Sequence, residues 1–245
     1  MLELSRLCKA YKAREGRVEA LRPLDLRIRQ GEIFGLLGPN GAGKTTAVKM
    51  IMGFLHPSGG RVVFQGRELA VTDPRRGIGY LPESFRPNPH LSVAEYVRFH
   101  CLLAREDRMA SDPEAEAAAL LQRVGMEQYG HRRISDLSKG MEQRVGLAQA
   151  FAGDPEMLIL DEPTSGLDPL GRSEVIDLLL SLNRGGKTIF FSSHILSEVE
   201  RLCDRIGILV GGKLQFLGTA GEFKEKWQVN DLEEGFKMEA RCVPS

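Results

Sequence analysis

A glycine-rich run from residue 38 to residue 46 contains the side chains best suited to chemistry in this sequence. It reads Gly-Pro-Asn-Gly-Ala-Gly-Lys-Thr-Thr and follows the apolar stretch Ile33 to Leu37. Glycine lacks a Cβ, so the backbone there can adopt positive φ and bring its N–H groups close to phosphate oxygens. A helix that begins directly after such a loop adds its positive dipole end. The run therefore predicts a loop that binds a nucleoside triphosphate.

The residues of this predicted phosphate site have separate roles. We expect Lys44 to reach the β- and γ-phosphates and the Thr45 hydroxyl to complete the coordination of a magnesium ion. The alternative is a glycine turn with a solvated lysine, and the loop alone does not say which triphosphate chemistry it serves. The predicted phosphate-binding residues are Gly38, Pro39, Asn40, Gly41, Ala42, Gly43, Lys44, Thr45 and Thr46.

Two neighbouring carboxylates form a second feature. Asp161 and Glu162 follow the four apolar residues 157–160. This pattern places them at the carboxyl end of a buried strand, which is where ligands bind in open α/β sheets. We expect Asp161 to hold magnesium through its water shell and Glu162 to polarise the water that attacks the γ-phosphate. A pair of solvated loop carboxylates is the alternative.

A third feature lies about twenty residues before the carboxylates. The segment Leu137 to Val145 begins with Ser138, Lys139 and Gly140 and leads into a helix that runs through Phe151. Exposed amides at a helix start favour an anion. The signal is weak by itself, because serine is a common first residue of any helix.

The surrounding pattern predicts an α/β protein. Residues 2–29 alternate apolar and polar positions and predict antiparallel strands, and residues 61–64 predict another strand. Strands at 33–37, 157–160, 188–191 and 206–210, with a helix starting at Asp168-Pro169 and ending near Asn183, predict a parallel sheet with helices on its faces. We expect a helix over 47–53.

The middle of the chain has helical character. Ser92 and Glu95 form a capping-box pattern for a helix to about Ala104, and Asp112-Pro113 predicts the start of a second helix that ends before Gly125. We therefore expect a single domain over 1–221, with a helical subdomain inserted at about 84–152. The segment 222–245 is expected to be a short helical tail.

Composition excludes several classes of protein. The 245 residues include 33 basic and 33 acidic side chains, so the net charge does not point to a nucleic-acid partner. Four cysteines without a CxxC pair argue against zinc and a disulfide framework. No apolar run reaches the length of a membrane span, and residues 1–3 do not open a signal peptide. We expect a cytosolic protein whose membrane role, if any, comes through a partner.

The order of these features resembles the nucleotide-binding subunit of ATP-binding cassette (ABC) transporters. Leu137 to Met141 is similar to the signature motif of that family, and the order of glycine loop, signature, paired carboxylates and switch histidine fits the family along nearly the whole length. The resemblance implies a P-loop NTPase (RecA-like) core with a parallel sheet, an N-terminal antiparallel β subdomain and an inserted α-helical subdomain. It also implies a head-to-tail dimer that holds each ATP between the P-loop of one subunit and the signature of the other.

The resemblance assigns roles to further residues. Tyr11 matches the aromatic residue that stacks on adenine, and His194 matches the switch histidine that contacts the γ-phosphate. Ser138 and Gly140 match phosphate-facing positions of the signature. Asp168 lies in a segment similar to the D-loop, which contacts the opposite subunit.

The chain departs from the family pattern at three positions. Lys139 replaces the second glycine of the signature, and Met141 replaces its glutamine. Glu83 stands where the Q-loop usually has glutamine. A carboxylate at Glu83 still ligates magnesium, but it donates no hydrogen bond unless it is protonated.

The resemblance also implies a physiological role. Residues 79–83 and 91–96 look like those of ATPases paired with ABC-2-type exporter permeases, and a chain that ends at Ser245 has no room for the regulatory domains of many importers. We expect an ATPase that powers export through a separate permease, on the cytoplasmic side of the membrane, with a second ATPase subunit. One alternative is a soluble ABC-type ATPase of a cytosolic assembly system such as iron–sulfur cluster biogenesis. Another is a GTPase or kinase, although the guanine motif Asn-Lys-x-Asp is missing.

Overall fold

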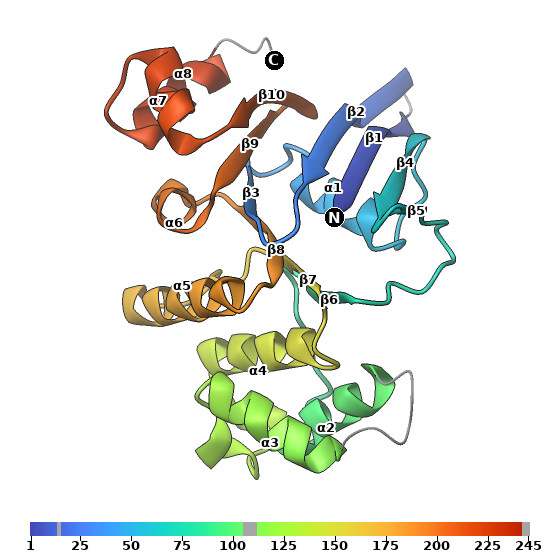
Figure 1. Ribbon diagram of the computed structural model, residues 1–245, viewed down its shortest axis with the longest axis vertical. Coiled ribbons are helices and arrows are strands. Elements are labelled where there is room, and N and C mark those ends of the chain that lie inside the picture. The colour runs from blue at the N-terminus through green and yellow to red at the C-terminus, as the bar shows by residue number, and fades with distance from the viewer. Residues whose placement is uncertain (14–15, 105–111, 242–245) are drawn as a thin grey trace. The chain divides into compact units, whose positions relative to one another are not determined.

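The computed structural model describes residues 1–13, 16–104 and 112–241, which form two compact units. The first unit joins Met1–Arg75 to Thr188–Ser245, and the second unit is Arg76–Lys187. Figure 1 labels the elements of both units. The chain leaves the first unit once and later returns to it.

An antiparallel sheet forms the N-terminal part of the first unit, as the alternating pattern predicted (Figure 1). Its strand order is β2-β1-β4-β5. Along β2 the apolar side chains from Leu21 to Ile28 are buried and the polar side chains between them are exposed, which is typical of a sheet with one face on the core. The strands are β1 (Leu2–Ala13), β2 (Gly16–Ile28), β4 (Gly59–Phe64) and β5 (Arg67–Glu68).

The first unit also contains a group of parallel strands. The strand β3 (Ile33–Leu37) pairs in parallel with β8 (Thr188–Ser193) and with β9 (Arg205–Val210). Every residue of β3 and β8 is buried, as expected for parallel strands covered on both faces. The strand β10 (Lys213–Gly218) adds to β9 in the antiparallel direction.

In the described residues of the first unit, four helices accompany these strands. The helix α1 (Lys44–Ile51) follows the glycine loop, and α6 (Leu196–Leu202) packs against β3 and β8. The expected tail forms α7 (Ala220–Trp227) and α8 (Leu232–Arg241) and belongs to the first unit. The two helices are joined by a buried carboxylate, Glu239, which accepts hydrogen bonds from Lys226 and Trp227.

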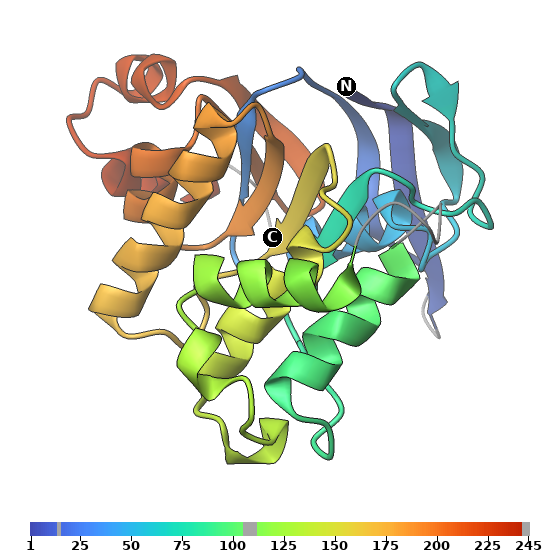
Figure 2. The ribbon, with the colours of Figure 1, turned by 60° about the horizontal axis from the view of Figure 1, so that its bottom comes forward.

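The second unit combines a parallel strand pair with helices. The strand β6 (Ile78–Leu81) pairs in parallel with β7 (Met157–Asp161). The helices α2, α3 and α4 contact one another (Figure 2). The helices are α2 (Val93–Ala104), α3 (Pro113–Arg123), α4 (Lys139–Phe151) and α5 (Pro169–Arg184), with short 3-10 turns η1 (Glu127–Tyr129) and η2 (Ile134–Asp136).

Helix starts in this unit agree with the capping signals in the sequence. Ser92 and Glu95 exchange the two hydrogen bonds of a capping box, and the Asp112 carboxylate accepts from the amide of Glu114. The helices of the expected subdomain lie within the second unit, which also contains β6, β7 and α5. The domain limits 1–221 and 84–152 stay predictions.

Several elements differ from the sequence-based expectation. The helix α1 begins at Lys44 and ends at Ile51, so it starts three residues earlier than predicted and includes the end of the glycine loop. The strands β6 and β10 and the helix α6 were not predicted, since each is short and has little periodicity. The sequence did contain a signal for β10, the pair Gly211-Gly212, which forms the tight turn of a β-hairpin with positive φ at both residues.

Across residues 1–13, 16–104 and 112–241, no helix combines the length and the apolar character needed to span a bilayer.

Because β6 packs closely against α4, we expect a methyl group added at Gly79 to destabilise the fold. A Cβ at Gly79 would overlap the carbonyl oxygen of Ala150 and lie 2.9 Å from Pro155 Cγ. We expect Gly79→Ala to lower the free energy of unfolding by about 2–4 kcal/mol, because a helix backbone must shift. Gly221→Ala is the control, since its Cβ would lie 3.8 Å from the nearest atom, and we expect a change below about 1 kcal/mol. Urea titration measures both, and equal stability of the two variants would contradict the packing argument.

Candidate functional site

The glycine loop lies between β3 and α1, in the order that the sequence predicts. Gly41 and Gly43 have φ of 79° and 105°, conformations that residues with a Cβ rarely adopt. Because Gly43 has no side chain, it supplies no side-chain cap to the first amides of α1. Those amides and the helix dipole suit an anionic ligand.

Gly38 is required for a different reason from the one the sequence suggested. Its φ is not positive, so positive φ was the wrong argument for this residue. A Cβ there would overlap the carbonyl oxygen of Leu209 in β9 and lie 2.9 Å from the Ala42 side chain. The loop therefore starts with a close approach to the neighbouring strand. Pro39 and Asn40, which follow, are exposed.

Lys44 folds back over the glycine loop. Its ammonium donates hydrogen bonds to the carbonyl oxygens of Gly38 at 2.7 Å and Pro39 at 3.4 Å, and the residue is only 6% exposed. A buried ammonium held by carbonyl dipoles gains from an anion nearby. Thr45 and Thr46 are half-buried in the first turn of α1.

The predicted switch histidine lies at the same sheet edge as the glycine loop. Leu37, the last residue of β3, pairs with Ser193, the last residue of β8, and His194 follows directly and is exposed. The Ser193 hydroxyl accepts a hydrogen bond from the amide of Ile195 at 2.9 Å and lies 3.4 Å from Glu198 Oε2. Ser193 thus fixes the turn that carries His194, a role that the sequence did not indicate.

Tyr11 lies on β1 of the first unit. Its side chain is 44% exposed, and the ammonium of Lys9 lies 5.1 Å from the ring centroid. An exposed aromatic ring of this kind is chemically suited to stacking on a base.

The predicted acidic residues lie together in the second unit. Asp161 ends β7 and is fully buried, and Glu162 is 5% exposed. Glu162 has a φ of 53°, a left-handed conformation that is uncommon for a side chain of this size. Such strain persists where the surrounding structure holds it, often at functional sites. Glu83 is exposed and follows β6, whose Leu81 pairs with Leu160.

Tyr80 is a further residue of this acidic cluster that the sequence did not single out. Burial raises the pKa of its phenol to about 12, and the charges of Asp161 and Glu83 add to the shift. The phenol therefore stays neutral at physiological pH and remains a hydrogen-bond donor beside two carboxylates.

Two exposed helix starts carry the remaining predicted residues. Ser138 caps α4 by accepting a hydrogen bond from the Met141 amide at 3.3 Å, and Asp168 caps α5 by accepting from the Gly171 amide at 2.9 Å. A Cβ at Gly140 would lie 3.3 Å from Leu167 Cδ2, so the two starts are in contact. Ser138 and Asp168 are both exposed.

The structure thus groups the predicted residues in two sets. In the first unit are Tyr11, residues 38–46 and His194, and in the second unit are Glu83, Ser138, Gly140, Asp161, Glu162 and Asp168. The predicted magnesium ligands divide in the same way, with Thr45 in one unit and the carboxylates in the other. In the described part of the chain, no three His, Cys, Asp or Glu residues are grouped to hold a metal by themselves. The oxygen donors present are nevertheless those that magnesium prefers.

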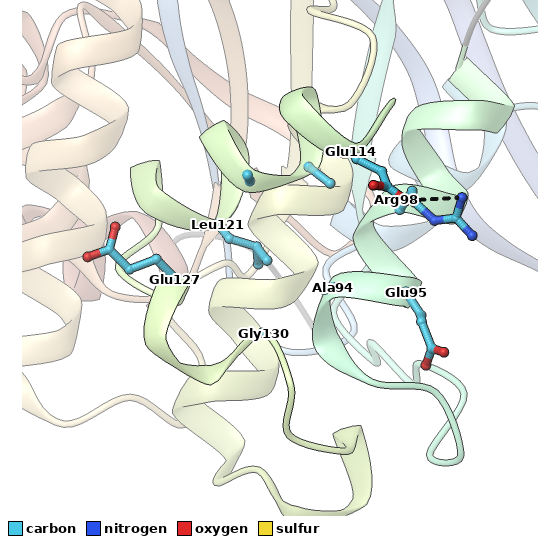
Figure 3. A pocket seen from close by; sticks show the side chains of 9 residues that line it. Ala94, Glu95, Arg98, Glu114, Leu121, Glu127 and Gly130 are labelled. Carbon is cyan, nitrogen blue, oxygen red and sulfur yellow. Dashed lines mark ion pairs between the residues drawn. The ribbon is translucent and has the colours of Figure 1, made fainter. Parts of the chain in front are cut away.

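A hollow between α2 and α3 contains none of the predicted site residues (Figure 3). Its floor is apolar, and its rim carries Glu95, Glu114 and Glu127, with Arg98 paired to Glu114 at 3.7 Å. The excess of carboxylates would repel a triphosphate, so this hollow is not the nucleotide site.

Comparisons with known proteins identify the family of this chain. The family profile described as ABC transporter matches residues 21–165. An uncharacterised ABC transporter ATP-binding protein of Synechocystis is 42% identical over 222 residues, which are 90% of this chain and 62% of that protein. The chain therefore spans less than two thirds of that relative. The methionine import ATP-binding protein MetN of Xanthomonas euvesicatoria is 38% identical over 91% of this chain and 68% of that protein.

A solved structure has the same fold. The ATP-binding cassette MJ0796, as a dimer in a post-hydrolysis state bound to ADP and phosphate, aligns with a TM-score of 0.83 and 28% identity. The alignment covers 89% of this chain and 98% of that one. The family match, the relatives and the glycine loop of the first unit lead to one conclusion: this chain belongs to the ABC transporter family and contains its ATP-binding domain.

Proposed function

We propose that this chain binds and hydrolyses ATP as one subunit of a dimer and thereby drives a separate membrane permease. The observation that carries the proposal is the glycine loop, where the buried Lys44 ammonium donates to Gly38 and the first turn of α1 has no side-chain cap. Family membership makes ATP the expected triphosphate.

Each predicted residue has a role in hydrolysis. Lys44, Thr45 and the loop amides neutralise charge that develops on the phosphates. Glu162 orients the attacking water. His194 approaches the γ-phosphate from the end of β8, next to the loop. Magnesium would supply further positive charge to the phosphates, and its expected oxygen ligands are Thr45 in the first unit and Asp161 and Glu83 in the second.

Dimerisation completes the proposed site. The exposed positions of Ser138 and Asp168 leave both available to a second subunit. The related cassette MJ0796 is a dimer, which supports this arrangement. The partner subunit's Ser138 would then contact the nucleotide bound by residues 38–46 and complete its binding site.

The direction of transport has two candidates. Residues 79–83 and 91–96 resemble export ATPases, and export is the direction we infer from them. Import is the second candidate, because the MetN relatives are named as methionine import proteins. A cytosolic assembly ATPase is not favoured, since the relatives described above are ABC transporter proteins. The chain would lie on the cytoplasmic side of the membrane through its permease.

Replacing the proposed base separates hydrolysis from binding. We expect Glu162→Gln to lower ATP turnover at least about 100-fold and to change the Kd for ATP less than about threefold, since the amide cannot accept the proton. Turnover is measured by phosphate release, and the Kd by titration with a fluorescent ATP analogue. Glu156→Gln, an exposed position just before the same strand, is the control and should retain full turnover. Normal turnover in the Glu162 variant would contradict the assignment.

Mixing two inactive variants tests the composite site. Lys44→Ala removes the loop ammonium, and Ser138→Ala removes the signature hydroxyl, so each homodimer should hydrolyse ATP at below about one tenth of the wild-type rate. A heterodimer keeps one intact pair of loop and signature, and the mixture should therefore be several times more active than either variant. Equal activity of the mixture and the separate variants would contradict a head-to-tail dimer. Thermal unfolding checks that both variants fold.

Purification from membranes tests the transport role. We expect the affinity-tagged chain to recover a polytopic permease from detergent-solubilised membranes. Recovery of soluble partners without a permease would support the assembly alternative and would contradict transport.

A further inference from the structure

We propose that Lys139 is a positioning residue, whose aliphatic chain packs across Gly166 and fixes the loop 162–168 to the first turn of α4. The inference rests on the proposed ATPase function, because that loop begins with Glu162. It concerns a position where the sequence departs from the family pattern, since a glycine is usual there.

The side chain of Lys139 lies directly beside Gly166. A Cβ on Gly166 would lie 2.6 Å from Lys139 Cε and 2.8 Å from both Cδ and Nζ. The far half of the lysine side chain therefore occupies the space beside the glycine backbone. Gly166 also has a φ of 77°, so the loop turns at the point where the lysine covers it.

Two other contacts join the same pair of segments. The amide of Gln143, which is buried, donates a hydrogen bond to the carbonyl oxygen of Pro163 at 2.8 Å. Gly140 approaches Leu167 closely, as described above. These contacts form a seam between α4 and the loop 162–168. Lys139 adds a third contact at the exposed end of this seam, where a glycine would make no side-chain contact.

Helix stability does not account for a lysine at this place. Lys139 is the first residue of α4, where the dipole disfavours a positive side chain. Packing on Gly166 is a compensating contact that the structure shows. Because the loop starts at the strained Glu162 and ends at Asp168, holding its middle limits the movement of both ends.

Two substitutions separate the packing of the stem from the charge of the ammonium. Lys139→Ala removes the stem, and Lys139→Met keeps most of it without the charge. We expect the alanine variant to lower kcat about tenfold with less than about a twofold change in the Kd for ATP, since only positioning is lost. The methionine variant should retain at least half of the wild-type kcat. Lys213→Ala, at an exposed lysine on β10, is the control and should change neither value.

Amide hydrogen exchange gives a readout that is independent of activity. The amides of residues 164–168 should exchange faster in the alanine variant than in the wild type, and at the wild-type rate in the methionine variant. Equal losses in both variants, or unchanged exchange and kcat in the alanine variant, would overturn the inference. If the wild-type chain hydrolyses ATP no faster than its Glu162→Gln variant, the proposed function fails, and the exchange rates still decide whether Lys139 holds the loop.

Discussion

The predicted phosphate site of the first unit depends on the shape of the glycine loop between β3 and α1. Peptide amides bind phosphate only where the backbone turns without side chains in the way, and Gly41 and Gly43 provide this with positive φ. Lys44 then holds the loop by donating to Gly38 and Pro39. The neighbouring strand β9 lies so close that Gly38 tolerates no Cβ, so the loop geometry depends on the sheet below it.

Strand order places the chemistry at the ends of buried strands. In the first unit, the parallel pairing of β3 with β8 puts His194 beside the glycine loop. In the second unit, the pairing of β6 with β7 puts Glu83 near Asp161, and the pKa of Tyr80 is raised by burial first and then by both of these charges. The same rule therefore applies in both units, because parallel strands bring their carboxyl ends to one edge.

The second unit also carries features that a family resemblance does not supply. The seam between α4 and the loop 162–168 is closed by the Gln143 hydrogen bond and by packing of glycines on larger side chains. It ties the signature segment to the loop after the carboxylates within one chain. In the sequence, Lys139 is only a departure from the signature motif of the family. In the structure, its side chain lies against Gly166.

The sequence by itself determined the local chemistry and most of the elements. Glycine spacing, capping residues such as Ser92 and Asp112, and buried apolar runs act over a few residues, so they are readable without a fold. Only the tertiary structure decided what depends on distant partners. Examples are the reason for Gly38, the support of His194 by Ser193, the environment of Tyr80 and the contact of Lys139 with Gly166. In most of these cases the interacting partner lies far away along the chain, so the spacing of residues in the sequence does not reveal the interaction. Ser193 instead acts through the backbone turn that follows β8.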